Sequence, residues 1–134
     1  MWKRQFGIEG LVTSGTVGIT LPDGSVRGPD AAFIPSERLD VLDRNDMVGF
    51  APVVPTFVAE VRSGSDRLKP LQRKMTDVWI ANGVSLAFLL DIEGQQTFVY
   101  RADGSIELIK GTTGKVSGEE VLPGFELDLG LFYW

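Results

Sequence analysis

The sequence contains no cysteine and no histidine among its 134 residues. Without cysteine, the chain forms no disulfide bond and has no thiol nucleophile. Without histidine, a Ser-His-Asp triad is impossible, and zinc sites built on histidine or cysteine are excluded as well. Any chemistry must therefore come from Asp, Glu, Lys, Arg, Ser, Thr or Tyr side chains, or from the backbone.

Positive charge is also scarce, because 13 Lys and Arg residues face 18 Asp and Glu residues, giving a net charge of −5 and a pI of about 4.7. This balance argues against a protein that coats nucleic acid or a membrane through bulk positive charge. It remains compatible with an acidic site that recruits a divalent metal ion.

Long apolar runs are absent. The longest strongly apolar run covers residues 84–90, which is far too short to span a bilayer. The N-terminal residues MWKRQFGIEG lack the apolar stretch of a signal peptide. We therefore expect a soluble, cytoplasmic protein with no membrane partner, folded as a single domain over residues 1–134.

Gly and Pro divide the first half of the chain into short segments. Residues 16–21 alternate weakly and end at the turn signal Pro22-Asp23-Gly24-Ser25. A second strand is predicted from Val26 through Pro29-Asp30 to Ile34, so that the two segments form a β-hairpin. A short helix is expected from Pro35 to about Leu42, followed by a loop over residues 43–55.

The second half begins with a strand–helix–strand unit. Residues 56–61 and 84–90 predict buried strands, and a helix is expected from Pro70 to Asn82. Its apolar stripe has helical spacing. The stripe consists of Leu71, Met75, Val78 and Trp79. A crossover of this kind makes its two strands parallel.

The remaining residues predict a second hairpin and a short C-terminal strand. Residues 95–101 and 106–110 flank a turn, and the tail from Val121 ends in the apolar sequence Leu131-Phe132-Tyr133-Trp134. Together the segments predict an α+β fold, with a mixed β-sheet of about six or seven strands and one main crossover helix.

Glu60 is the most informative polar residue, since it lies in the otherwise apolar strand FVAEV. A buried carboxylate is costly unless it is paired or binds a metal ion. Strand alternation places Glu60 and Arg62 on one face and Phe57, Ala59 and Val61 on the other. The sequence therefore leaves two interpretations open: an ion pair between Glu60 and Arg62, or a metal ligand.

Two further residues can join Glu60 in a site. Lys74 lies at the border of the apolar stripe, where its stem can pack while its ammonium group reaches past the helix edge. Asp30 follows Pro29, which stiffens the approach to the carboxylate. Each also has a purely structural interpretation, as a surface lysine and as a turn residue.

Two carboxylates beside a cation are the groups that a magnesium site needs. Mg²⁺ takes oxygen ligands and keeps several water molecules. It then activates water and neutralises charge on a phosphoryl group, while a neighbouring lysine or arginine stabilises the transition state. A glycosidase with two carboxylates is a weaker alternative, because no aromatic platform lies near Asp30 or Glu60 in the sequence.

An ordered set of motifs covers the chain from about Thr16 to its end. They are GPDAA (28–32), FAP (50–52), PTFVAEVRSGSDRLKPL (55–71), QRKM (72–75), IANGV (80–84), LLD (89–91) and SGEEVLPGF (117–125). This set resembles the Uma-two family of putative restriction endonucleases, within the PD-(D/E)xK nuclease superfamily.

The resemblance implies a restriction-endonuclease-like fold, a bound divalent metal (Mg²⁺ or Mn²⁺) and hydrolysis of DNA phosphodiester bonds. By this resemblance, Asp30 and Glu60 correspond to the two metal-binding acids, and Val61 offers its backbone carbonyl to the metal. The superfamily's lysine two residues after the second acid is replaced by Arg62. The family's functional lysine on the following helix points to Lys74. The predicted catalytic set is therefore Asp30, Glu60, Lys74 and Arg62.

A second hypothesis is a catalytically inactive nuclease fold that serves as a binding or oligomerisation module. The family resemblance implies a longer N-terminal helical segment than residues 1–15 provide here, and the net charge is negative. The apolar tail from Leu131 to Trp134 would then be a subunit contact in a homodimer, although packing under the sheet is an alternative place for it.

Overall fold

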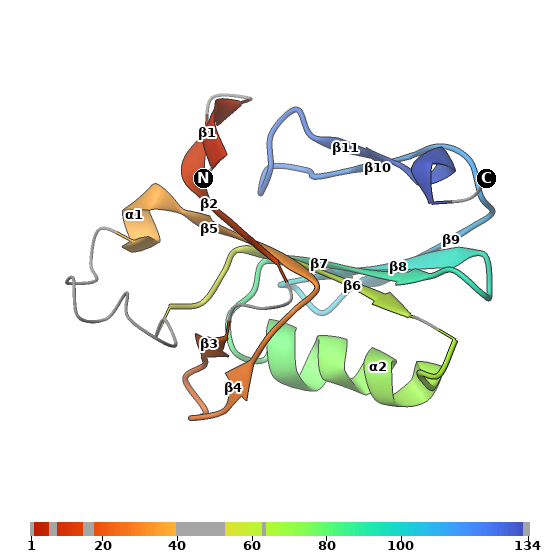
Figure 1. The fold of residues 1–134 in the computed structure, drawn as a ribbon, viewed down its shortest axis with the longest axis horizontal. Coiled ribbons are helices and arrows are strands. Elements are labelled where there is room, and N and C mark those ends of the chain that lie inside the picture. The colour runs from red at the N-terminus through yellow and green to blue at the C-terminus, as the bar shows by residue number, and fades with distance from the viewer. Residues whose placement is uncertain (1, 6–7, 15–17, 40–52, 63, 133–134) are drawn as a thin grey trace.

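The structure is a computed structural model that describes residues 2–5, 8–14, 18–39, 53–62 and 64–132 (Figure 1). Within these ranges no helix is both long enough and apolar enough to cross a membrane. The predicted end of the first helix at Leu42, most of the loop over residues 43–55, and the last two tail residues lie outside them.

A seven-stranded mixed sheet forms the centre of the molecule, in the order β1-β2-β5-β6-β7-β8-β9. Its strands are β1 Trp2–Gln5, β2 Ile8–Ser14, β5 Ala31–Pro35, β6 Phe57–Arg62, β7 Leu86–Asp91, β8 Gln96–Arg101 and β9 Ile106–Lys110. Strands β6 and β7 are parallel, and the other neighbouring pairs are antiparallel. The α+β fold with a mixed sheet of this size confirms the prediction from the sequence.

The helix between β6 and β7 is the expected crossover. Helix α2, Leu68–Lys74, continues directly into a wider-wound helical segment, Met75–Ile80. The helix begins two residues before Pro70, which is tolerated there because the first turn leaves its backbone N–H groups without helical partners. After the helix ends, Gly83 adopts a φ of +109°, a conformation that glycine takes without steric cost.

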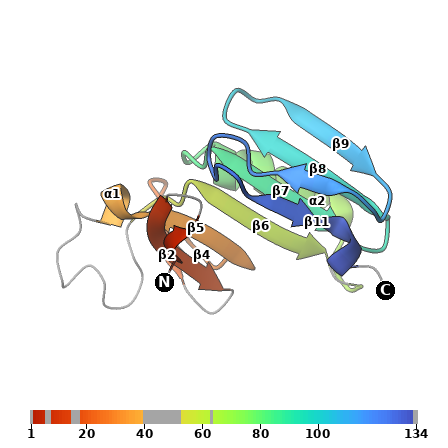
Figure 2. The same cartoon turned by 90° about the horizontal axis from the view of Figure 1, so that it is seen from above.

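The two faces of the sheet are covered by different elements (Figures 1 and 2). On one face lie α2 and a small hairpin of β3, Ile19–Thr20, and β4, Val26–Arg27. On the other lies the hairpin of β10, Lys115–Ser117, and β11, Glu126–Asp128, followed by a 3-10 turn over Leu129–Leu131.

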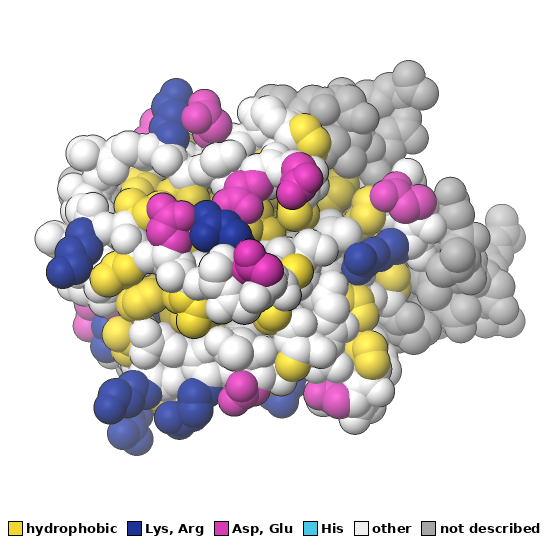
Figure 3. Space-filling view, turned by 180° about the vertical axis from the view of Figure 1, so that it is seen from behind, with side chains coloured by type: hydrophobic (Ala, Val, Ile, Leu, Met, Phe, Trp, Pro, Cys, Tyr) yellow, Lys and Arg dark blue, Asp and Glu magenta, His cyan; other side chains and the backbone are white. Residues whose placement is uncertain are grey.

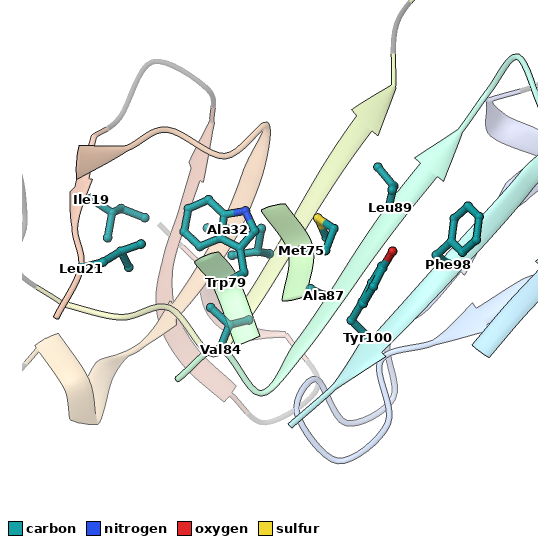
Figure 4. Packing of buried hydrophobic residues seen from close by; sticks show 11 residues of the cluster. Ile19, Leu21, Ala32, Met75, Trp79, Val84, Ala87, Leu89, Phe98 and Tyr100 are labelled. Carbon is teal, nitrogen blue, oxygen red and sulfur yellow. The ribbon is translucent and has the colours of Figure 1, made fainter. Parts of the chain in front are cut away.

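Each covered face has its own apolar core. Under α2, the fully buried Met75 and Trp79 pack with Ile19 and other residues of the sheet and hairpin (Figure 4). On the opposite face, Phe57 and Phe88 meet edge to face, with ring centroids 5.0 Å apart, beneath the β10–β11 hairpin. Because the first core joins the crossover helix to β6, it fixes the height of α2 above the end of that strand.

The N-terminal part of the chain differs from the prediction. The first strand was expected at Thr16, but β1 and β2 precede it and extend the sheet beyond β5. The strand expected over residues 26–34 is divided, because β4 pairs with β3 whereas β5 pairs with β2 and β6. Pro29 explains the division, since proline lacks an N–H for a ladder and restricts the preceding Gly28. Short helix α1, Ser36–Leu39, begins as expected.

Close contact between β2 and β5 provides a test of this added strand. A Cβ atom at Gly10 would overlap the Ile34 carbonyl oxygen and the Phe33 ring. We expect Gly10→Ala to lower the free energy of unfolding by about 1–3 kcal/mol, as overpacking does elsewhere. The control is Val12→Ala in the same strand, since Val12 is 45% exposed and should change stability by no more than about 0.5 kcal/mol. Equal urea midpoints for the two variants would contradict the pairing of β2 with β5.

Candidate functional site

An open pocket lies on the α2 side of the sheet, where β5 begins and β6 ends. Its volume is about 460 Å³. It is lined by Gly28, Asp30, Glu60, Val61, Asp66, Leu71 and Lys74. Four of the five residues predicted for the site, Arg62 being the exception, therefore line one pocket, although Asp30 and Lys74 are separated by more than forty positions in the sequence.

Sheet register explains why the two predicted acids meet. Ala31 is the partner of Ala59 across the antiparallel β5–β6 pair, so that Asp30 and Glu60 follow at adjacent positions. Val58 and Ala32 both belong to the core under α2. Because side chains alternate along a strand, Glu60 and Asp30 project to that same face.

Backbone hydrogen bonds orient both carboxylates. The backbone N–H of Asp30 donates to Glu60 Oε1 over 3.1 Å, and the backbone N–H of Val61 donates to Asp30 Oδ2 over 2.7 Å. The two acids are thereby tied to each other's strand. Asp30 is exposed to solvent, whereas Glu60 is only 4% exposed.

Two more donors satisfy the buried Glu60 carboxylate. Lys74 Nζ lies 2.6 Å from Oε2, and the indole Nε1–H of Trp79 donates to the same oxygen over 3.2 Å. The lysine ammonium also lies 5.9 Å from the centre of the Trp79 ring, within the range of a cation–π interaction. A buried charge is tolerated when it is paired and hydrogen-bonded in this way.

The donor set can be tested for a divalent metal by counting acceptor positions. A carboxylate oxygen accepts about two hydrogen bonds. Glu60 Oε2 accepts two, whereas Oε1 accepts one and keeps a position for a further partner. Asp30 accepts the Val61 N–H through Oδ2 alone among the described residues, which leaves Oδ1 for a ligand. The described residues form no group of three metal-binding side chains, but two carboxylates suffice for Mg²⁺, which keeps several waters.

Arg62 is placed differently from the other predicted residues. Its NH1 atom lies 2.8 Å from Asp91 Oδ1, and its Nε–H donates to the backbone carbonyl of Asp66. Arg62 and Asp91 are register partners across the parallel β6–β7 pair, which brings the opposite charges together. Arg62 is not among the residues that line the pocket.

Trp79 and Asp66 belong to the site but were not predicted for it. Trp79 was expected only as part of the apolar stripe, and Asp66 lines the pocket from the loop before α2. A buried tryptophan usually finds an acceptor for its N–H. The carboxylate of Glu60 on the strand before the helix could therefore have predicted the contact with Trp79. No comparable sequence pattern pointed to Asp66.

The C-terminal tail divides between the core and the surface. Phe132 packs against the core beneath the β10–β11 hairpin, whereas Leu131 is 69% exposed. The last two residues of the predicted contact segment lie outside the described ranges.

Comparison with known protein families identifies the family of this chain. The model of the Uma2 family, described as a putative restriction endonuclease, matches residues 2–130. The chain belongs to the Uma2 family. The resemblance found in the sequence motifs is therefore confirmed over almost the whole chain.

A solved structure shares the fold. The crystal structure of a putative nuclease belonging to DUF820 from Anabaena variabilis superimposes with a TM-score of 0.77 and 15% sequence identity. The match covers 92% of this chain and 68% of that one. No curated protein matches the sequence. The family is thus one of putative restriction endonucleases, and the fold is shared with a solved putative nuclease.

The hydrogen bond between Trp79 and Glu60 can be measured directly. Trp79→Phe removes the indole N–H, and a lost bond to a charged group lowers the free energy of unfolding by about 1.5–3 kcal/mol. Loss of ring volume adds to this, so the variant is combined with Glu60→Gln in a double-mutant cycle monitored by urea unfolding. We expect a coupling energy of at least about 0.5 kcal/mol. Strictly additive effects would show that the contact contributes nothing.

The buried Asp91 predicts how acid affects stability. Burial opposes ionisation of Asp91, but hydrogen bonds from Gln96, Arg62 and the Gly94 N–H outweigh it and lower the pKa of the carboxyl group. A pKa lower in the folded state stabilises the protein above the unfolded value of about 3.9, and that contribution is lost as the pH falls through the folded pKa. Asp91→Asn should therefore destabilise the protein most at pH 7, and the difference from wild type should shrink towards pH 3. A difference in urea midpoint that stays constant across this range would exclude this titration.

Proposed function

We propose that this protein is a metal-dependent endonuclease that hydrolyses DNA phosphodiester bonds in the pocket between β5, β6 and α2. The observation that carries the proposal is the convergence of Asp30 and Glu60 on one face of the sheet, each oriented by a backbone N–H of the other strand. Membership of the Uma2 family supports it.

The acids supply the ligands in this proposal. Asp30 Oδ1 and Glu60 Oε1 would hold Mg²⁺ or Mn²⁺, together with the backbone carbonyl of Val61. When bound, such an ion neutralises charge on the phosphoryl group and lowers the pKa of a water nucleophile. The hydrogen bonds from Val61 and Asp30 act before any ion arrives, because they already fix the direction of both carboxylates.

Lys74 has two functions in the pocket. It balances the Glu60 charge over 2.6 Å, and its side chain, 29% exposed, lines the pocket from the helix side. An ammonium group has three N–H donors, so the contact with Glu60 leaves donors for a phosphate oxygen. We therefore assign transition-state stabilisation to Lys74, and a structural ion pair with Asp91 to Arg62.

The experiment is the nicking of supercoiled plasmid by the purified protein in the presence of Mg²⁺ or Mn²⁺. We expect cleavage by the wild type and a loss of at least about 100-fold in Asp30→Asn, Glu60→Gln and Lys74→Ala, as when a group that stabilises a transition state is removed. Binding of Mn²⁺, followed by calorimetry, should weaken in the two acid variants and persist in Lys74→Ala.

Matched controls separate the site from general effects of charge. Asp77→Asn and Lys110→Ala make the same chemical changes at exposed positions outside the pocket and should retain wild-type cleavage. If the wild type cleaves with neither metal, or if the site variants cleave as fast as these controls, the endonuclease proposal is wrong. The Glu60–Lys74 pair would then be a structural feature of a binding module.

A further inference from the structure

The pocket is lined by more acidic than basic side chains, which disfavours an anionic substrate. Three acids, Asp30, Glu60 and Asp66, line it against the single cation Lys74. The whole chain also carries a net charge of −5. A phosphodiester backbone that approaches this pocket is repelled at long range unless cations lie close beside it.

The basic residues that could attract such a substrate are concentrated in one segment. Residues 67–74 contain Arg67, Lys69, Arg73 and Lys74 and no acidic residue, so that 4 of the 13 basic residues lie within eight positions. The first three are exposed, and no ion pair joins any of them to another described residue. Figure 3 shows Lys and Arg side chains gathered along the lower left edge, the side on which α2 lies in that view.

The same helix serves the pocket and this surface. Leu71 and Lys74 line the pocket, whereas Lys69 and Arg73 are four residues apart and therefore share a different, outward side of the helix. An α-helix with its side chains is only about 10–12 Å across, so these cations lie close enough to the pocket to contact a strand that has one phosphate there.

We infer that Lys69 and Arg73 on the exposed side of α2, together with Arg67 immediately before the helix, bind the phosphate backbone of the DNA next to the scissile bond. The inference rests on the proposed function and extends it to a substrate-binding surface. It also explains how a chain with an acidic pI engages a polyanion, because the favourable field of these three side chains is local.

An anionic membrane is the other polyanionic surface that a basic helix can bind. Helices that lie on membranes expose large apolar side chains beside their basic residues. The exposed large apolar residues in the described ranges are Val12, Val26, Ile106, Leu108 and Leu131, and none of them belongs to α2. The composition of the exposed face therefore favours nucleic acid.

The test measures DNA binding separately from cleavage. Anisotropy of a fluorescein-labelled 20-base-pair duplex is recorded in the Asp30→Asn background with EDTA, over a series of salt concentrations. The double variant Lys69→Gln/Arg73→Gln is compared with Lys110→Gln/Lys115→Gln. The second pair changes the net charge equally, at exposed positions on strands β9 and β10. We expect the first pair to weaken binding at least about fivefold and to lower the salt slope by about 1.8, as for two lost phosphate contacts, while the control pair retains the slope.

Each outcome bears on the inference. Equal effects of the two pairs, or absence of duplex binding in the Asp30→Asn background at low salt, would overturn it. Binding to phosphatidylserine vesicles that depends on Lys69 and Arg73, without such binding to the duplex, would assign the surface to a membrane instead. If the DNA result holds while the wild type cleaves no plasmid, the binding surface stands and the hydrolytic proposal fails. Circular dichroism is recorded for both double variants, and each is expected to keep the wild-type spectrum.

Discussion

A buried negative charge sets the conditions for the rest of this structure. Glu60 is 4% exposed in the middle of the sheet, where an unpaired carboxylate is too costly to persist. Its partners come from three directions: an ammonium group and an indole from the crossover helix, and a backbone N–H from the neighbouring strand. Helix α2 must therefore lie at one height and rotation above β6, and β5 must begin opposite the end of β6. The packing of Met75 and Trp79 under the helix meets the same requirement.

The same contacts hold the carboxylates of the pocket in fixed orientations. Groups that hold a carboxylate in one rotamer before a ligand arrives remove the need to reorder it later. Lys74 and Trp79 both contact Glu60 Oε2, whereas Oε1 accepts the Asp30 N–H and keeps one position for a ligand. The basic residues of α2 divide between the pocket and the surface, since Lys74 faces the pocket and the other basic residues of the helix face solvent. An acidic protein can thus present a cationic surface beside an anionic pocket.

Much of the sheet followed from local sequence signals. The apolar runs on either side of the helix predicted β6, β7 and their parallel pairing, because a crossover of that length leaves one geometry. The second hairpin was equally clear from its turn. Strand β2 was missed because it pairs with β5 beyond the intervening β3–β4 hairpin, and β1 was missed with it because it pairs with β2. The division between β4 and β5 was missed because Pro29 allows either a continuing strand or a break.

The sequence by itself determined which side-chain types are available and which of them share a face of β6. Absence of cysteine and histidine excludes thiol and imidazole groups, and strand alternation places Glu60 and Arg62 on one face. Only the tertiary structure decided which cation meets that carboxylate. Arg62 shares a face with Glu60, but its register partner on β7 is Asp91, and the two side chains form an ion pair over 2.8 Å. Lys74 and Trp79 contact Glu60 because the core under α2 sets the rotation of the helix. That core is formed by segments far apart in the sequence, so no local sequence pattern predicts it.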